Sequence, residues 1–97
     1  MLENLSLSQN IDEEACIGTL VEMVRHKSYS ESEGEYELTK LMVRKMSSMG
    51  LEAELYPVEN GRFNAVGIWR GTGGGKSLLF NGHLDTNPVT EGWTVDP

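Results

Sequence analysis

The sequence of 97 residues contains one cysteine and no cluster of Lys or Arg, and each absence excludes a class of protein. Cys16 alone cannot form an intrachain disulfide. The net charge of −7 and the lack of a basic cluster argue against nucleic acid or an anionic membrane as a partner. No apolar run approaches the ~18 residues of a membrane helix, and the N-terminus has no secretory-signal pattern. We therefore expect a cytoplasmic protein.

The composition is typical of a folded chain, with 38% hydrophobic and 24% charged residues. Residues 1–10 are polar and are expected to form a loose arm. The apolar periodicity then predicts a helix over residues 12–27. Asn10 and Glu13 have the spacing of a capping box at its start. Cys16 falls within this helix, where we expect a small core residue.

A second helix is predicted over residues 33–49. Ser32 and Glu35 have the spacing of a capping box. Apolar residues recur on one face, with Met42, Met46 and Met49 among them, and such a stripe is expected to belong to the core. Gly50 follows directly, and glycine commonly ends a helix in a left-handed conformation.

After Gly50 the pattern changes to the alternation of strands. Residues 51–55 and 63–69 flank an Asn60–Gly61 turn and predict an antiparallel hairpin. Residues 77–81 form a short apolar run, which predicts a third strand in the middle of a sheet. The preceding Gly-rich stretch ends in Gly-Lys-Ser, but Arg70 stands where a phosphate-binding P-loop has its first glycine. We therefore exclude a nucleotide site there.

The end of the predicted third strand has the residues best suited to chemistry. His83 and Asp85 are two positions apart, so in extended chain both side chains point the same way. A neutral imidazole can bind a metal through one nitrogen while a carboxylate accepts from the other. A hydrogen-bonded surface histidine is the structural alternative. The pair therefore gives the hypothesis of a metal site.

The residues around this pair resemble a known family. Residues 82–88 read Gly-His-Leu-Asp-Thr-Asn-Pro and residues 92–97 read Gly-Trp-Thr-Val-Asp-Pro. This pattern resembles the zinc-dependent amidohydrolases and exopeptidases, which include acetylornithine deacetylase, succinyl-diaminopimelate desuccinylase, aminoacylase and the glutamate carboxypeptidases. The resemblance implies an α/β fold. Residues 1–97 would be the N-terminal part of a zinc-exopeptidase-like catalytic domain, with two helices on a partial mixed sheet of about three strands and without the family's dimerisation domain.

The resemblance also implies roles for the two site residues. His83 would ligate one of two zinc or cobalt ions, and Asp85 would orient it as part of the catalytic machinery. The remaining ligands and the general base would lie beyond residue 97. The complete protein, expected as a homodimer, would hydrolyse the amide bond of an N-acyl amino acid or small peptide by a metal-activated water.

Two alternatives to an active enzyme stay open. Because a catalytic zinc needs about three protein ligands, we expect these 97 residues alone to be inactive. The chain could instead be a small non-catalytic module that binds a partner at an open sheet edge. It could also be an inactive remnant of the enzyme.

Overall fold

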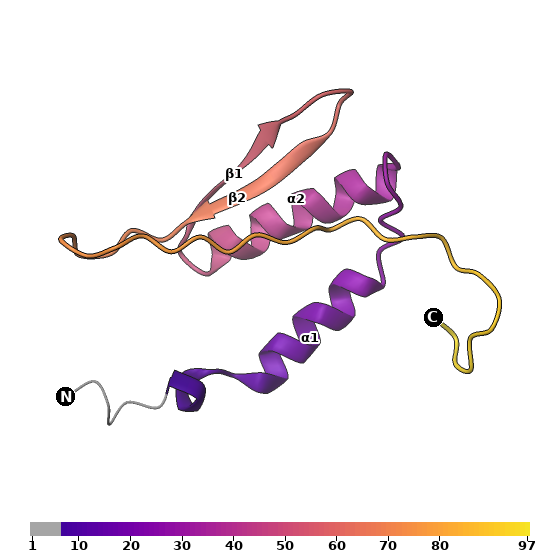
Figure 1. The fold of residues 1–97 in the computed structure, drawn as a ribbon, viewed down its shortest axis with the longest axis horizontal. Helices are drawn as coiled ribbons and strands as arrows, with labels where there is room; N and C mark the ends of the chain where they lie inside the picture. Colours follow the sequence, from indigo (N-terminus) through magenta and orange to yellow (C-terminus); the bar gives the residue numbers. More distant parts are fainter. Residues whose placement is uncertain (1–6) are drawn as a thin grey trace.

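The computed structural model describes residues 7–97 and contains two helices and a hairpin (Figure 1). The element order is η2 (Leu7–Asn10), α1 (Glu13–Val24), α2 (Glu33–Ser48), β1 (Glu52–Pro57) and β2 (Phe63–Ile68). The predicted α/β class is confirmed. In the described residues the sheet has two strands, so the prediction of about three was wrong. Of the polar arm expected over residues 1–10, residues 1–6 lie outside the described residues and the rest form η2, a 3-10 turn.

Helix α1 is shorter than predicted. Asp12, and not Asn10, is the N-cap, because its side chain accepts a hydrogen bond from the backbone N–H of Ala15 at 3.0 Å. The helix ends at Val24, so the basic residues that follow lie beyond its last turn. There the His26 ring contacts the backbone oxygen of Glu22 through Nδ1 at 3.0 Å.

Helix α2 closely matches its prediction. Ser32 is the N-cap, and its Oγ accepts from the Glu35 N–H at 3.2 Å. The Glu35 carboxylate in turn accepts from the N–H of Glu31 at 3.1 Å, one residue before the position expected of a capping box. Gly50, with φ of 95°, lies in the left-handed region after the last turn, as predicted.

The antiparallel hairpin is also confirmed. Strands β1 and β2 pair in the register that places Glu52 opposite Ile68 and Pro57 opposite Phe63. Asn60 and Gly61 both have positive φ, of 56° and 73°, which is the conformation that makes this dipeptide a strong turn signal.

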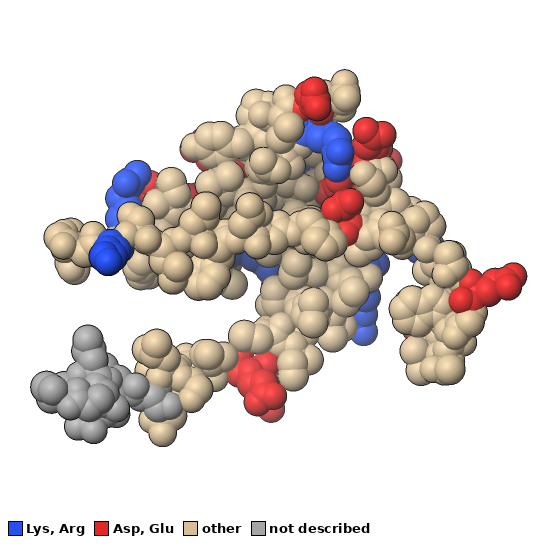
Figure 2. All heavy atoms as spheres, in the orientation of Figure 1, with Lys and Arg blue, Asp and Glu red and all other residues tan. Residues whose placement is uncertain are grey.

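An ion pair fastens the hairpin turn to the start of α2. Two of the guanidinium nitrogens of Arg62 donate to the Glu35 carboxylate, Nε at 3.1 Å and one terminal nitrogen at 2.5 Å. This bond raises the pKa of Arg62 above its ordinary value. Acidic and basic side chains accordingly lie side by side between the turn and the start of α2 (Figure 2).

The third strand predicted over residues 77–81 is absent from the described structure, and that prediction was wrong. The side chains of Leu78, Leu79 and Phe80 are 79%, 84% and 86% exposed. A strand needs a partner to satisfy its backbone N–H and C=O groups, and the hairpin does not pair with this segment. In the described chain, no helix follows Lys76.

The core is small. Leu38 of α2 is the one fully buried apolar residue among residues 7–97. Met42 and Met46 are partly buried, whereas Met49 is 59% exposed, so the predicted stripe contributes to the core only in part. Gly67 of β2 allows close packing on α2, since a Cβ there would lie 2.5 Å from the Met46 sulfur.

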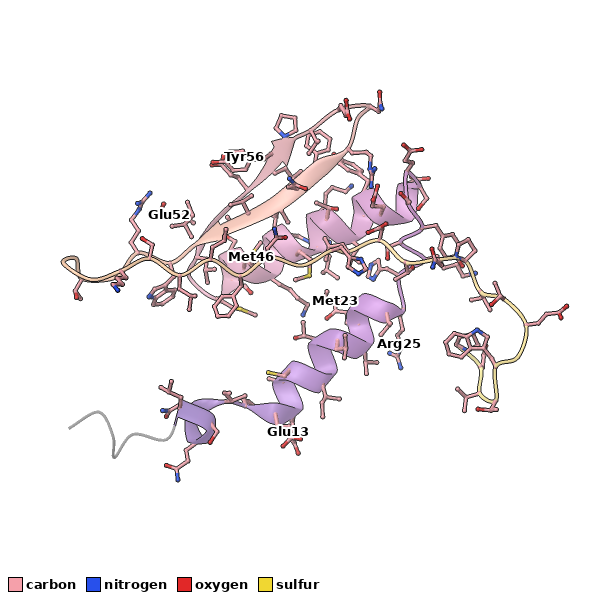
Figure 3. All side chains as sticks on the ribbon, in the orientation of Figure 1. Glu13, Met23, Arg25, Met46, Glu52 and Tyr56 are labelled. Atoms are coloured by element: carbon pink, nitrogen blue, oxygen red, sulfur yellow. The ribbon has the colours of Figure 1, made fainter. Side chains whose placement is uncertain are left out.

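Helix α1 contributes little to this core. Helix α1 lies apart from the hairpin (Figure 3), and none of its residues is buried. Cys16 is exposed, so its predicted core position was wrong. An ion pair of 2.7 Å between Glu22 and Lys45 links α1 to α2. The radius of gyration of 16.5 Å exceeds the roughly 13 Å of a compact domain this size. Neither described helix is long and apolar enough to cross a membrane.

Candidate metal centre

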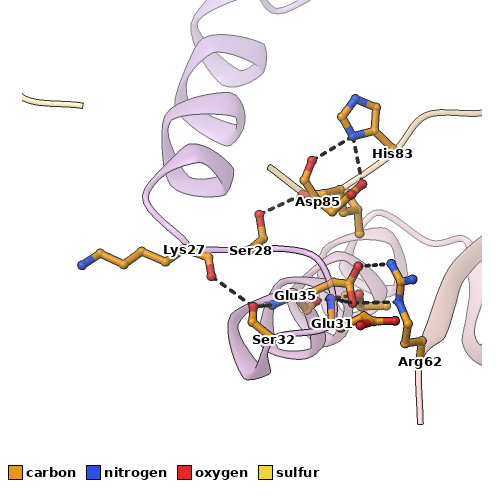
Figure 4. A network of polar contacts seen from close by, with 10 residues as sticks. Lys27, Ser28, Glu31, Ser32, Glu35, Arg62, His83 and Asp85 are labelled. Carbon is orange, nitrogen blue, oxygen red and sulfur yellow. Dashed lines mark hydrogen bonds and ion pairs between the residues drawn. The ribbon is translucent and has the colours of Figure 1, made fainter. Parts of the chain in front are cut away.

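The structure brings the two predicted site residues into contact. The Nδ1 atom of His83 lies 3.1 Å from Oδ1 of Asp85 and 2.8 Å from its backbone oxygen (Figure 4). A carbonyl oxygen can only accept a hydrogen bond, so the proton belongs on Nδ1. The other ring nitrogen, Nε2, then keeps its lone pair. This tautomer is the one that binds a metal through Nε2.

The pair is accessible from solvent. The side chain of His83 is 83% exposed and that of Asp85 is 40% exposed. Nδ1 makes the hydrogen bonds of the His83 ring to Asp85, and Nε2 points away from Asp85 (Figure 4). The ring is therefore free to take a ligand without rearrangement.

The donor set around His83 is incomplete within residues 7–97. No group of three or more His, Cys, Asp or Glu side chains in this part of the chain is placed to hold a metal ion. A catalytic zinc has about three protein ligands and a water. The described residues thus fit one ligand of such a site together with its supporting carboxylate.

A serine in the connection between α1 and α2 holds the chain on both sides of Asp85. Ser28 is fully buried, its Oγ donates to the backbone oxygen of Leu84 at 2.8 Å, and its backbone oxygen accepts from the N–H of Thr86 at 2.9 Å. Tyr29 and Thr86 form an isolated parallel bridge beside these bonds. The sequence analysis assigned no role to Ser28, because a serine in a polar loop has no local signal of a partner 56 residues away.

A glycine lets α2 approach this connection closely. A Cβ on Gly34 would lie 2.0 Å from the backbone oxygen of Lys27, a distance that real Cβ atoms do not adopt. The first turn of α2 thus packs directly on the residue that precedes Ser28. The absent side chain at position 34 therefore helps to define where Ser28 lies.

Comparison with known proteins shows a similarity to a bacterial deacetylase. The chain is 41% identical over 64 residues to acetylornithine deacetylase from Pasteurella multocida (strain Pm70). The match covers 62% of this chain and 16% of that protein, so the chain spans about a sixth of the length of this relative. No family model matches the chain, and no solved structure matches it. The similarity is thus confined to a short part of that deacetylase.

Proposed function

We propose that this chain is the N-terminal part of the catalytic domain of a metal-dependent amidohydrolase, in which His83 is a metal ligand and Asp85 orients it. The observation that supports this most directly is the contact of Nδ1 with the backbone oxygen and with Oδ1 of Asp85, since it leaves the lone pair of Nε2 free to bind a metal. The similarity to acetylornithine deacetylase supports the same reaction class.

The two residues would have different roles at the site. Asp85 accepts the Nδ1 proton, which fixes the ring tautomer and makes the imidazole a better donor. His83 would present Nε2 to one of two zinc or cobalt ions, both of which accept imidazole ligands. Bound there, such ions would supply Lewis-acid chemistry, namely polarisation of an amide carbonyl and a lowered pKa of a water. The other ligands and the general base would come from residues outside this sequence.

The proposed substrate is an N-acyl amino acid or a small peptide. Acetylornithine is the first to test, because the matched relative is named for it. The complete protein is proposed to be a cytoplasmic homodimer. These 97 residues alone are proposed to be inactive, since they supply one ligand of the metal site.

A segment exchange tests the proposed reaction. This chain would replace the matching segment of the Pasteurella multocida enzyme, and acetylornithine hydrolysis would be measured with zinc present. We expect an active chimera whose His83→Ala variant loses at least ~10²-fold in kcat/KM, while the matched His26→Ala variant stays active. A folded, active chimera that tolerates His83→Ala would refute the role of His83.

The exposed segment around Leu79 favours a second candidate function. Three consecutive apolar side chains, 79–86% exposed, would suit an extended strand that a partner chain completes by strand addition. In this case the chain would be a binding module without catalysis. An inactive chimera that folds, together with capture of an extended apolar peptide by residues 78–80, would favour this reading over the enzyme.

A further inference from the structure

We propose that Ser28 is a positioning residue for His83 and Asp85, acting through the backbone on either side of Asp85. Calling the positioned group a metal ligand rests on the proposed function, whereas the positioning itself rests on geometry alone. Ser28 is fully buried and uses its hydroxyl and its carbonyl oxygen to bind the same short segment. It lies far from that segment in the sequence but next to it in space (Figure 4).

The peptide plane between Asp85 and Thr86 links the serine to the histidine. Its N–H, on Thr86, donates to the Ser28 carbonyl oxygen at 2.9 Å. Its carbonyl oxygen, on Asp85, accepts from Nδ1 of His83 at 2.8 Å. The N–H and C=O of a trans peptide point in opposite directions from one rigid plane. The Ser28 bond thus sets the direction of the carbonyl that holds the His83 proton.

The hydroxyl of Ser28 fixes the preceding peptide plane in the same way. It donates to the carbonyl oxygen of Leu84 at 2.8 Å, and that plane ends at the nitrogen of Asp85. Both peptide planes that meet at the Asp85 Cα are therefore held. With them the carboxylate is aimed at Nδ1, which lies 3.1 Å from Oδ1.

These contacts matter because the rest of the segment has little to hold it. In the described structure, Ser28 makes two hydrogen bonds that join residues 77–97 to the connection between α1 and α2, beside the isolated bridge of Tyr29 with Thr86. His83 itself is largely exposed, so packing does not fix its ring. The orientation of the ring therefore depends on the Asp85 backbone, and the Asp85 backbone depends on Ser28.

The test compares two substitutions that each remove a buried hydroxyl in the 97-residue chain. Ser28→Ala deletes the bond to Leu84. Thr39→Val is the matched control, because Thr39 is also buried and its hydroxyl also donates to a backbone carbonyl at 2.8 Å, but within α2. The readout is the pair of His83 ring nitrogens in a long-range ¹H–¹⁵N spectrum without metal, at pH about 8, where imidazole is neutral.

We expect a protonated Nδ1 and an unprotonated Nε2 in the unsubstituted chain and in Thr39→Val. In Ser28→Ala the ratio of the two tautomers should fall roughly five-fold, the effect of one ordinary hydrogen bond. An unchanged His83 spectrum in a folded Ser28→Ala chain would overturn the proposal.

A second measurement uses the unsubstituted chain, so it can be made even if Ser28→Ala fails to fold. The Thr86 amide, bonded to the Ser28 carbonyl, should exchange with solvent at least ~10-fold more slowly than the Asn87 amide. Equal exchange rates would overturn the proposal. Neither readout uses metal, so a chain that passes both, while the active chimera described above tolerates His83→Ala, would refute the proposed function and leave the positioning role intact.

Discussion

Adding one methyl group to Gly34 should destabilise the chain although it improves the helix. Gly34 lies in the first turn of α2, and Gly18 lies within α1. Replacing a helical glycine by alanine ordinarily stabilises a protein by ~0.5–1 kcal/mol. A Cβ at Gly18 meets nothing within 4 Å, so Gly18→Ala should show this gain. At Gly34 the close neighbour turns this gain in stability into a loss.

The magnitude at Gly34 follows from the geometry of its neighbour. A Cβ would lie 2.0 Å from the Lys27 carbonyl oxygen, whereas ordinary contact begins at 3.4 Å, so the two backbones must separate by about 1.4 Å. Overpacking of this kind costs ~1–3 kcal/mol. The shift also moves Ser28, whose two bonds of 2.8 and 2.9 Å cannot survive it and contribute ~1 kcal/mol each. After the gain of up to ~1 kcal/mol in helix propensity is subtracted, we expect a net loss of ~2–4 kcal/mol.

The assay is urea unfolding of both alanine variants followed by circular dichroism, with Thr86 amide exchange as a local probe of the site. Gly34→Ala should unfold at lower urea than the unsubstituted chain and should lose protection at Thr86. Gly18→Ala should unfold at equal or higher urea and keep that protection. If Gly34→Ala is as stable as Gly18→Ala, the close approach of α2 to Lys27 is not a feature of the folded chain.

Two further predictions test the core and the link between the helices. Leu38→Ala should lose ~2–4 kcal/mol in urea unfolding because Leu38 is 2% exposed, whereas Phe80→Ser, at a side chain that is 86% exposed, should change stability by less than ~0.5 kcal/mol; equal losses would show that Phe80 is packed. The Lys45 ammonium lowers the pKa of Glu22 below 4.5, so their pair stabilises the fold above that pH and ceases to do so as the pH falls through the folded value. Lys45→Met should raise this pKa toward 4.5 in an NMR titration, and an unchanged value would contradict the pairing.

The parts of the fold that were predicted correctly depend on local chemistry. The Ser32 cap, the stop at Gly50 and the Asn60–Gly61 turn each involve residues within a few positions of one another. Such interactions can be recognised from the local sequence, because no distant partner takes part in them. The choice of Asp12 over Asn10 as the cap of α1 shows the limit of this reasoning, because two good caps stood two residues apart.

The errors concern elements whose state depends on distant partners. Residues 77–81 have the composition of a buried strand, but a strand also needs a neighbour, and the two-stranded hairpin does not supply it. Cys16 and the apolar face of α1 are exposed for a similar reason, because no layer covers them in the described structure. The role of Ser28 could not be seen at all, since its partner lies 56 residues away.

At the site, too, part of the arrangement could be predicted from the sequence and part could not. The contact between His83 and Asp85 was predictable because two positions in extended chain bring both side chains to one side. The backbone bond from His83 to the Asp85 carbonyl was not predictable, and it is this bond that assigns the proton to Nδ1. The sequence pattern thus predicted which two side chains meet, and the structure shows that Nδ1 is the ring nitrogen that makes the contact.

The central claim is that His83 binds a metal through Nε2, and a zinc titration of the ¹⁵N-labelled chain tests it most directly. The chain has two histidines, and His26 is the internal control, since its Nδ1 contacts the Glu22 backbone oxygen in a partly buried setting. Zinc should shift Nε2 of His83 first, at concentrations that leave His26 unchanged, and Asp85→Asn should weaken this response by ~10-fold or more. Equal responses from both rings, or a first response from His26, would contradict the claim.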